Sequence, residues 1–131
     1  MSKKSKVSYW KEVKFNIDIY DWDIQYIELK DYSHLKKLKK IMTEFHCDSK
    51  ELNKVMIDLK AKATNVGVHF YDLNKRKTFI LLYPCRTNED KMDIICHEKR
   101  HAEDRILIHL GIDDIESAGF LAGFIAKKIL S

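Results

Sequence analysis

Residues 66–111 read VGVHFYDLNKRKTFILLYPCRTNEDKMDIICHEKRHAEDRILIHLG, the stretch of this 131-residue chain with the clearest structural pattern. Val66 to Leu73 and Thr78 to Tyr83 are rich in β-branched and aromatic side chains, a composition typical of strands. The polar residues 74–77 between them predict a tight turn, so we expect the two strands to form an antiparallel hairpin. Pro84 ends the second strand, because proline has no backbone N–H to donate to a neighbouring strand.

The second half of this stretch predicts a long helix. Thr87 is a typical N-cap residue, and Asp90 at the third helical position is a weaker substitute for the glutamate of a capping box. Gly111 is expected just after the last turn, because glycine readily adopts the left-handed backbone conformation that ends many helices. A hairpin followed by one long helix is therefore the predicted arrangement of residues 66–111.

Two further strands are predicted nearer the N-terminus. From Val13 to Ile19, apolar residues alternate with polar ones, which is the pattern of a half-buried strand. A second extended segment, Ile24 to Leu29, is expected to pair with the first. Asp21 to Asp23 would supply the turn between them.

Three more helices are predicted from apolar residues at helical spacing. Ser33 is expected to cap the first, the second runs from residue 48 or 49 to about 59, and the last covers about 114–130. In the last helix, Gly119 and Gly123 lie four positions apart on one face. Each glycine costs a helix about 1 kcal/mol relative to alanine, so we expect close contact with a neighbouring helix there.

The grouping of strands and helices predicts an α+β fold with a small, mostly antiparallel sheet of about four strands and four helices. A length of 131 residues fits one domain, which we expect to cover residues 1–131. Residues 1–8 are rich in lysine and serine and are predicted to form a flexible basic tail.

Composition excludes several classes of protein. With 45% hydrophobic and 34% charged residues, the chain is predicted to fold rather than stay disordered. No apolar stretch approaches the roughly 18 residues that cross a bilayer, and no signal peptide is recognisable, so we expect a cytoplasmic protein without membrane contact. The three cysteines lack C-x-x-C spacing and are expected to be reduced. Although the net charge is +4, no aromatic residues are interleaved with the lysines at 36–40, so nucleic-acid binding is not expected.

The sequence His97-Glu98-Lys99-Arg100-His101 carries the predicted chemistry. Side chains four positions apart share a helix face, so His97 and His101 are expected to bind one Zn²⁺ ion. Glu98 points about 100° around the helix and is predicted to act as a general base on the water that zinc activates. Cys96 is expected to be a core thiol rather than a ligand.

Residues 97–104 resemble the active-site helix of the zincin metallopeptidases, whose motif is HExxH. The short loop and helix that follow resemble the gluzincin branch, small forms of which occur in proteins of phages and mobile elements. The resemblance covers about residues 66–125. It implies a zincin-like active-site helix with His97, His101 and Glu116 as metal ligands, Glu98 as catalytic base, Zn²⁺ as cofactor and a peptide or protein as substrate.

The third ligand stays open on the residues alone. Asp113 and Asp114 are alternatives to Glu116. Asp104 shares the face of the two histidines but lies about 7 Å along the axis from their midpoint, a position better suited to an outer partner than to a ligand. In the zincins a Tyr or His near the active-site helix can stabilise an oxyanion, so the resemblance makes His69, Tyr71 and Tyr83 candidates for this role. On the residues alone, each of the three is expected to be a packing residue.

Two functional hypotheses follow. The first is a zinc-dependent metallopeptidase that hydrolyses peptide bonds with activated water. The alternative is a non-catalytic, zincin-like protein-interaction module with a structural or vestigial metal site. Retention of Glu98 favours the enzyme, because a structural site needs no acid or base beside its ligands. The sequence does not fix the substrate or the oligomeric state.

Overall fold

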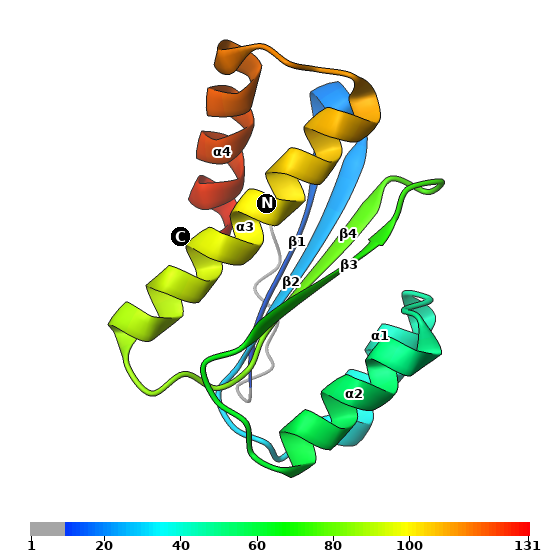
Figure 1. Cartoon of the computed structure of the whole chain (residues 1–131), viewed down its shortest axis with the longest axis vertical. Coiled ribbons are helices and arrows are strands. Elements are labelled where there is room, and N and C mark those ends of the chain that lie inside the picture. Colours follow the sequence, from blue (N-terminus) through cyan, green and yellow to red (C-terminus); the bar gives the residue numbers. More distant parts are fainter. Residues whose placement is uncertain (1–9) are drawn as a thin grey trace.

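A four-stranded sheet with a pair of helices on each face makes up the computed structural model, which describes residues 10–131 (Figure 1). The predicted tail at residues 1–8 lies outside the described residues. The elements in chain order are β1 (Trp10–Ile17), a 3-10 turn (Asp18–Tyr20), β2 (Trp22–Leu29), α1 (Leu35–Glu44), α2 (Ser49–Lys60), β3 (Gly67–Asp72), β4 (Lys77–Leu82), α3 (Asn88–Leu110) and α4 (Ile115–Ile129). The predicted α+β class, with four strands and four helices, is confirmed.

The sheet has the strand order β1-β2-β4-β3. Both predicted hairpins form, because β1 pairs antiparallel with β2 and β3 pairs antiparallel with β4. The central pairing of β2 with β4 is parallel and sets Asp23 opposite Lys77. Parallel neighbours need a long crossover, which α1 and α2 supply here. Two of the three pairings are thus antiparallel, and β3 lies at one edge of the sheet.

Each face of the sheet has its own hydrophobic core, because successive strand residues point to opposite faces. Helices α1 and α2 cover one face and pack on a set that includes Ile27, Phe79 and Leu81. Helices α3 and α4 cover the other face and pack on a set that includes Ile80 and Leu82. Figure 1 shows the two helix pairs on opposite sides of the strands.

The long helix α3 begins and ends as the sequence predicts. The Thr87 hydroxyl accepts a hydrogen bond from the Asp90 amide at 3.0 Å. The Asp90 carboxylate does not complete a capping box but accepts from the Asn65 side chain at 3.1 Å, which connects the start of α3 to the segment before β3. Gly111 closes the helix with a left-handed backbone (φ 68°).

Three predictions in the first half are wrong. The first hairpin turns at residues 18–21 rather than at Asp21 to Asp23, because Trp22 and Asp23 already pair with β1. Strand β1 ends at Ile17, and Ile19 lies largely exposed in the 3-10 turn, because the chain turns there before the alternation is complete. The N-cap of α1 is His34 rather than Ser33. The Ser33 hydroxyl donates instead to the Asp31 carboxylate at 2.5 Å, so it stabilises the preceding turn.

The expected close packing at Gly119 and Gly123 is also wrong. Both glycines lie on the exposed side of α4, and a Cβ atom built at either position would meet nothing within 4 Å. The opposite side of α4 carries the residues that enter the core, which are Leu121, Ile125 and Ile129.

Among the described residues, no helix has the length and apolar character needed to cross a membrane. The lysines of α1 at positions 36, 37, 39 and 40 are exposed.

Candidate functional site

The site is formed where the edge strand β3 runs beside the middle of α3. Gly67, His69 and Tyr71 occupy alternate positions of β3 and therefore face the same side of the sheet. That side is the α3 side, because His69 and Tyr71 both contact α3 residues. These three strand residues lie beside the part of α3 that carries the predicted motif.

The two histidines of the motif converge on one point. The Nε2 atoms of His97 and His101 are 3.1 Å apart, and the ring centroids are 4.5 Å apart. Two nitrogen ligands of a tetrahedral zinc ion, each about 2.0–2.1 Å from the metal, lie about 3.3 Å from one another. Both side chains are exposed. The predicted pair therefore has the spacing and access that a shared metal ion requires.

Glu98 faces strand β3 rather than solvent and is buried, with 5% of its surface exposed. Its Oε2 atom is 2.5 Å from Nδ1 of His69. An ionised carboxylate only accepts hydrogen bonds, so Nδ1 of His69 carries the proton of this contact. A carboxylate buried without such a donor would be costly, and His69 satisfies it.

The second carboxylate oxygen of Glu98 has a different environment. The side chain makes one hydrogen bond within residues 10–131, and that bond uses Oε2. In the same part of the chain, no side-chain nitrogen or oxygen is both shut off from solvent and without a partner. Oε1 therefore remains in contact with solvent. One oxygen is held by the protein, and the other is able to accept a proton.

Tyr71 completes the row on β3. Its hydroxyl donates to the backbone carbonyl of His101 at 3.3 Å, and the Arg105 guanidinium lies 4.8 Å from its ring centroid. Burial raises the pKa of Tyr71, although Arg105 acts in the opposite direction, so the phenol stays protonated near neutral pH. Tyr83 faces away from the site, because its hydroxyl is hydrogen-bonded to Asp58 on α2.

An open depression of about 570 Å³ adjoins the histidines. It is lined by α3 residues that include both histidines and Asp104, and by Ala122 of α4. Cys96 also lines it and is exposed, so its predicted place in the core is wrong. Cys96 precedes His97 by one position and points outward with it, whereas the buried stripe passes through Ile95 and Glu98.

The structure does not bring Glu116 beside the histidines. Lys99 donates to the carbonyl of Ala122 at 3.2 Å, which marks where α3 and α4 meet. Glu116 lies six positions before Ala122, about 9 Å along α4, and is exposed in the first turn. Glu116 as a ligand stays a prediction.

The other candidates for the third ligand have different surroundings. Asp114 caps α4 by accepting from the Ser117 amide at 2.8 Å, and the hydrogen bonds from Ser117 lower its pKa. Asp113 is exposed in the loop between α3 and α4. Asp104 lines the depression of the histidines and lies 3.7 Å from the Arg100 side chain.

The donor set is incomplete as it stands. Within the described part of the chain, no group of three or more His, Cys, Asp or Glu side chains is arranged to hold a metal ion. His97 and His101 fit a metal as a pair of ligands, and a third protein ligand would have to move toward them.

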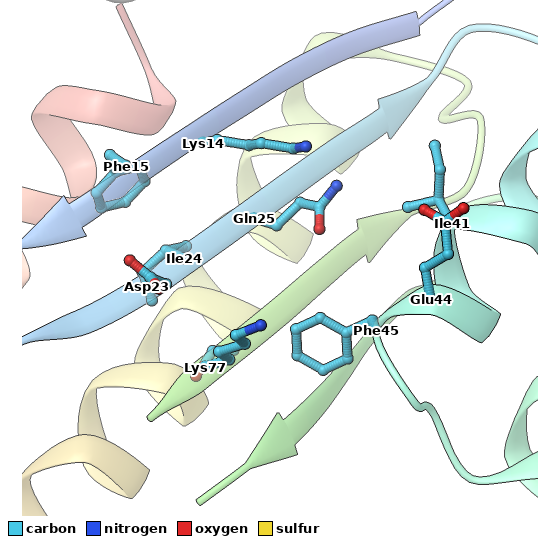
Figure 2. Close-up of a pocket in the computed structure, with 10 residues that line it drawn as sticks. Lys14, Phe15, Asp23, Ile24, Gln25, Ile41, Glu44, Phe45 and Lys77 are labelled. Carbon is cyan, nitrogen blue, oxygen red and sulfur yellow. The ribbon is translucent and has the colours of Figure 1, made fainter. Parts of the chain in front are cut away.

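A second depression, of about 440 Å³, lies on the opposite face of the sheet beside the end of α1 (Figure 2). Gln25 lies on the sheet between Lys14 and Lys77, and Ile41 and Phe45 border the space from α1. It has no histidine or cysteine in its lining, so it offers no alternative set of metal ligands of that kind.

Sequence reasoning singled out His69 and Tyr71 but missed the role of Gly67. Gly67 lies within the predicted strand 66–73 and is the first residue of β3. A Cβ atom there would lie 2.5 Å from Cγ of Glu98 and 2.6 Å from Cγ2 of Ile94. The signal in the sequence is the two-residue spacing of Gly67, His69 and Tyr71, which places all three on one strand face.

Comparison of the chain with protein-family models, with curated proteins and with solved structures found no match.

Proposed function

We propose that this chain is a zinc-dependent metallopeptidase, a hydrolase that uses His97 and His101 as metal ligands and Glu98 as general base. The observation that carries the proposal is the arrangement of one short segment of α3. Two Nε2 atoms lie 3.1 Å apart, and the adjacent buried carboxylate has one oxygen held by His69 and the other open to solvent. A helix that only packed on the sheet would have no need of this combination.

The residues of the chain have distinct tasks in this proposal. Bound between the two histidines, zinc would supply Lewis-acid chemistry and lower the pKa of a water to about 7. Oε1 of Glu98 accepts the proton of the attacking water and later delivers it to the leaving amine. Because the carboxylate is largely buried, its charge interacts strongly with groups nearby.

An extended peptide fits the exposed edge of the sheet. Strand β3 lies at one end of the strand order and pairs only with β4 among the described strands, so its outer edge is available for another strand. A peptide added there would bond through its main chain and pass beside α3. The free cysteines at 47, 85 and 96 agree with a cytoplasmic location, which is part of the proposal.

The alternative is a non-catalytic interaction module that keeps the zincin-like helix with a structural or vestigial metal. One observation favours it, namely the absence of a three-ligand group among residues 10–131. The two functions differ in what they require of Glu98, since only the enzyme needs a proton acceptor there.

Substitution of Glu98 by glutamine tests the proposal. The wild type should bind about one zinc per chain, and His97→Ala or His101→Ala should abolish this binding, measured by metal analysis after dialysis. Glu98→Gln should keep zinc and fold but lower the hydrolysis of a peptide panel by about 10²–10⁴-fold, because general-base catalysis typically contributes that much. Equal rates for wild type and Glu98→Gln would refute the peptidase mechanism. A zinc-loaded wild type inactive on a broad panel would support the interaction module.

A further inference from the structure

The carboxylate of Glu98 is held in place by groups from the edge strand rather than from its own helix. We infer that His69 is a positioning residue, which fixes the orientation of the Glu98 carboxylate through Oε2 and so leaves Oε1 in contact with solvent. The inference rests on the proposed function for its catalytic meaning. The contact itself is independent of that function.

The contact has the geometry of a strong hydrogen bond. The atoms Nδ1 of His69 and Oε2 of Glu98 are 2.5 Å apart, close enough for a direct hydrogen bond. The Glu98 side chain is 6% exposed and the His69 side chain 25%, so water competes weakly for the bond. No second side chain among residues 10–131 hydrogen-bonds to Glu98. The orientation of the carboxylate therefore depends on this one donor.

The stem of Glu98 is confined as well. Gly67 leaves room for it, since a Cβ atom at that position would lie 2.5 Å from Cγ and 3.2 Å from Cδ of Glu98. Ile94 borders the same space. The strand thus confines the side chain with Gly67 and orients its end with His69, two positions further along.

His69 is itself held by its neighbours. Its ring centroid lies 5.0 Å from that of Tyr71 and 4.9 Å from that of His101. These contacts limit rotation of the imidazole, so Nδ1 stays directed at Glu98. His69 therefore contacts both the Glu98 carboxylate and the ring of His101, a proposed metal ligand.

A fixed carboxylate reacts faster than a mobile one. Glutamate has several rotatable bonds, and ordering such a side chain costs conformational entropy. When His69 holds one oxygen, this ordering precedes the reaction. Loss of the correct geometry at a reacting group lowers rates by up to about 100-fold.

The first test measures the position of Glu98 directly and needs no substrate. In NMR of the full chain labelled at histidine and glutamate, the Nδ1 proton of His69 should exchange slowly in the wild type and quickly in Glu98→Ala. The Glu98 side chain should become mobile in His69→Leu and ordered again in His69→Asn, because the asparagine amide places a donor near the position of Nδ1. An Nδ1 proton unaffected by Glu98→Ala, or an equally ordered Glu98 in His69→Leu, would overturn the inference.

The second test uses the zinc-loaded protein and a peptide that it cleaves. His69→Leu should lower kcat by up to about 100-fold with little change in KM or zinc content, and His69→Asn should recover most of the rate. His109→Leu is the matched control, because His109 lies on the same helix but packs edge-on against Trp22 at 5.5 Å. A wild-type kcat in His69→Leu would overturn the positioning role while the proposed function stands. If the wild type cleaves nothing, the proposed function fails, and the NMR result still supports or overturns the contact.

Discussion

At the scale of residues, Gly67 and Gly119 differ in the space around their Cα atoms. At Gly67, an added methyl group would overlap the side chains of Glu98 and Ile94, whereas at Gly119 it would meet nothing within 4 Å. The strand glycine makes room for a functional side chain. The helix glycine has no such neighbour among residues 10–131.

The same substitution at these two glycines should therefore change stability in opposite directions. Gly67→Ala should lower the free energy of unfolding by about 1–3 kcal/mol, because a methyl group forced into a packed space displaces its neighbours. Gly119→Ala should raise it by up to about 1 kcal/mol, because alanine has the higher helix propensity. Urea denaturation of both variants beside the wild type measures the two effects. Stabilisation by Gly67→Ala would show that the Glu98 side chain is loosely held.

Two of the acidic candidates for the third ligand, Asp104 and Glu116, can be separated by zinc affinity. Asp104 lines the depression of the histidines, and Glu116 does not. Asp104→Ala should lower zinc affinity by about 10–100-fold, the range of outer partners of metal sites, and Glu116→Ala should have the smaller effect. Competition with a chromogenic chelator measures both. A larger loss in Glu116→Ala would mean that Glu116 is a ligand of the metal, as the gluzincin resemblance implies.

At the scale of elements, β3 and α3 run in the same direction, and successive β3 residues that face α3 contact positions further along the helix. Gly67 adjoins Ile94 and Glu98, His69 contacts Glu98, and Tyr71 reaches His101. Two residues of strand rise about 6.6 Å, and one helical turn rises 5.4 Å. Since these distances are similar, each step along the strand meets the next turn of the helix.

The stability of α3 should depend on its N-cap. Thr87→Ala should cost about 1 kcal/mol, because the Asp90 amide then loses its hydrogen-bond acceptor. Thr87→Ser is the control, since serine keeps the hydroxyl that accepts from the Asp90 amide. Thermal unfolding followed by circular dichroism should show a lower Tm for Thr87→Ala and little change for Thr87→Ser. Equal shifts would mean that the Thr87 hydroxyl does not stabilise α3.

Local signals in the sequence predicted the elements well. Alternation located both hairpins, although the first one turns at residues 18–21 rather than at Asp21 to Asp23, and Thr87 and Gly111 marked the two ends of α3. Ser33 misled because its hydroxyl is equally able to bond to the nearby Asp31. Helical spacing also predicted that His97 and His101 share a face.

Contacts between distant segments could not be predicted in the same way. Nothing local in the sequence indicates that His69 lies against Glu98, because that contact depends on how the sheet and helix pack. The parallel pairing of β2 with β4 is likewise a long-range choice. Glu116 depends on the angle between α3 and α4, which propensity and spacing do not specify.

At the scale of the whole molecule, the cysteines differ in how deeply they are buried. Cys47 packs against the core beneath α1 and α2, and burial raises its pKa to about 12 from a usual value of 9.0. Cys96 is exposed on α3. Because the thiolate is the reactive form, Cys47 should react about 1,000-fold more slowly than an unperturbed thiol, and burial should slow it further.

Alkylation of the native protein near neutral pH, read by mass spectrometry of peptides, should therefore label Cys96 first and Cys47 only on unfolding. The raised pKa has a consequence for stability with a definite sign. The folded state favours the neutral thiol, so this contribution is complete below pH 9 and is lost as the pH rises from about 9 to 12. Rapid labelling of Cys47 in the native protein would show that the core opens locally.

The order strand, strand, helix, helix occurs twice along the chain, and the two halves meet at the parallel pair β2 and β4. A half-turn about an axis that lies within the sheet, between these two strands and parallel to them, brings β2 onto β4 and β1 onto β3. Such a rotation also exchanges the faces of the sheet, which is why the helix pairs lie on opposite sides. The site described above draws its residues from the second half, at positions 67–122. Strand β2 of the first half nevertheless pairs with the inner edge of β4. Without β2, that edge would be free to pair with strands of other chains and cause aggregation. The two halves thus share the same order and arrangement of elements, but the candidate site lies in the second half.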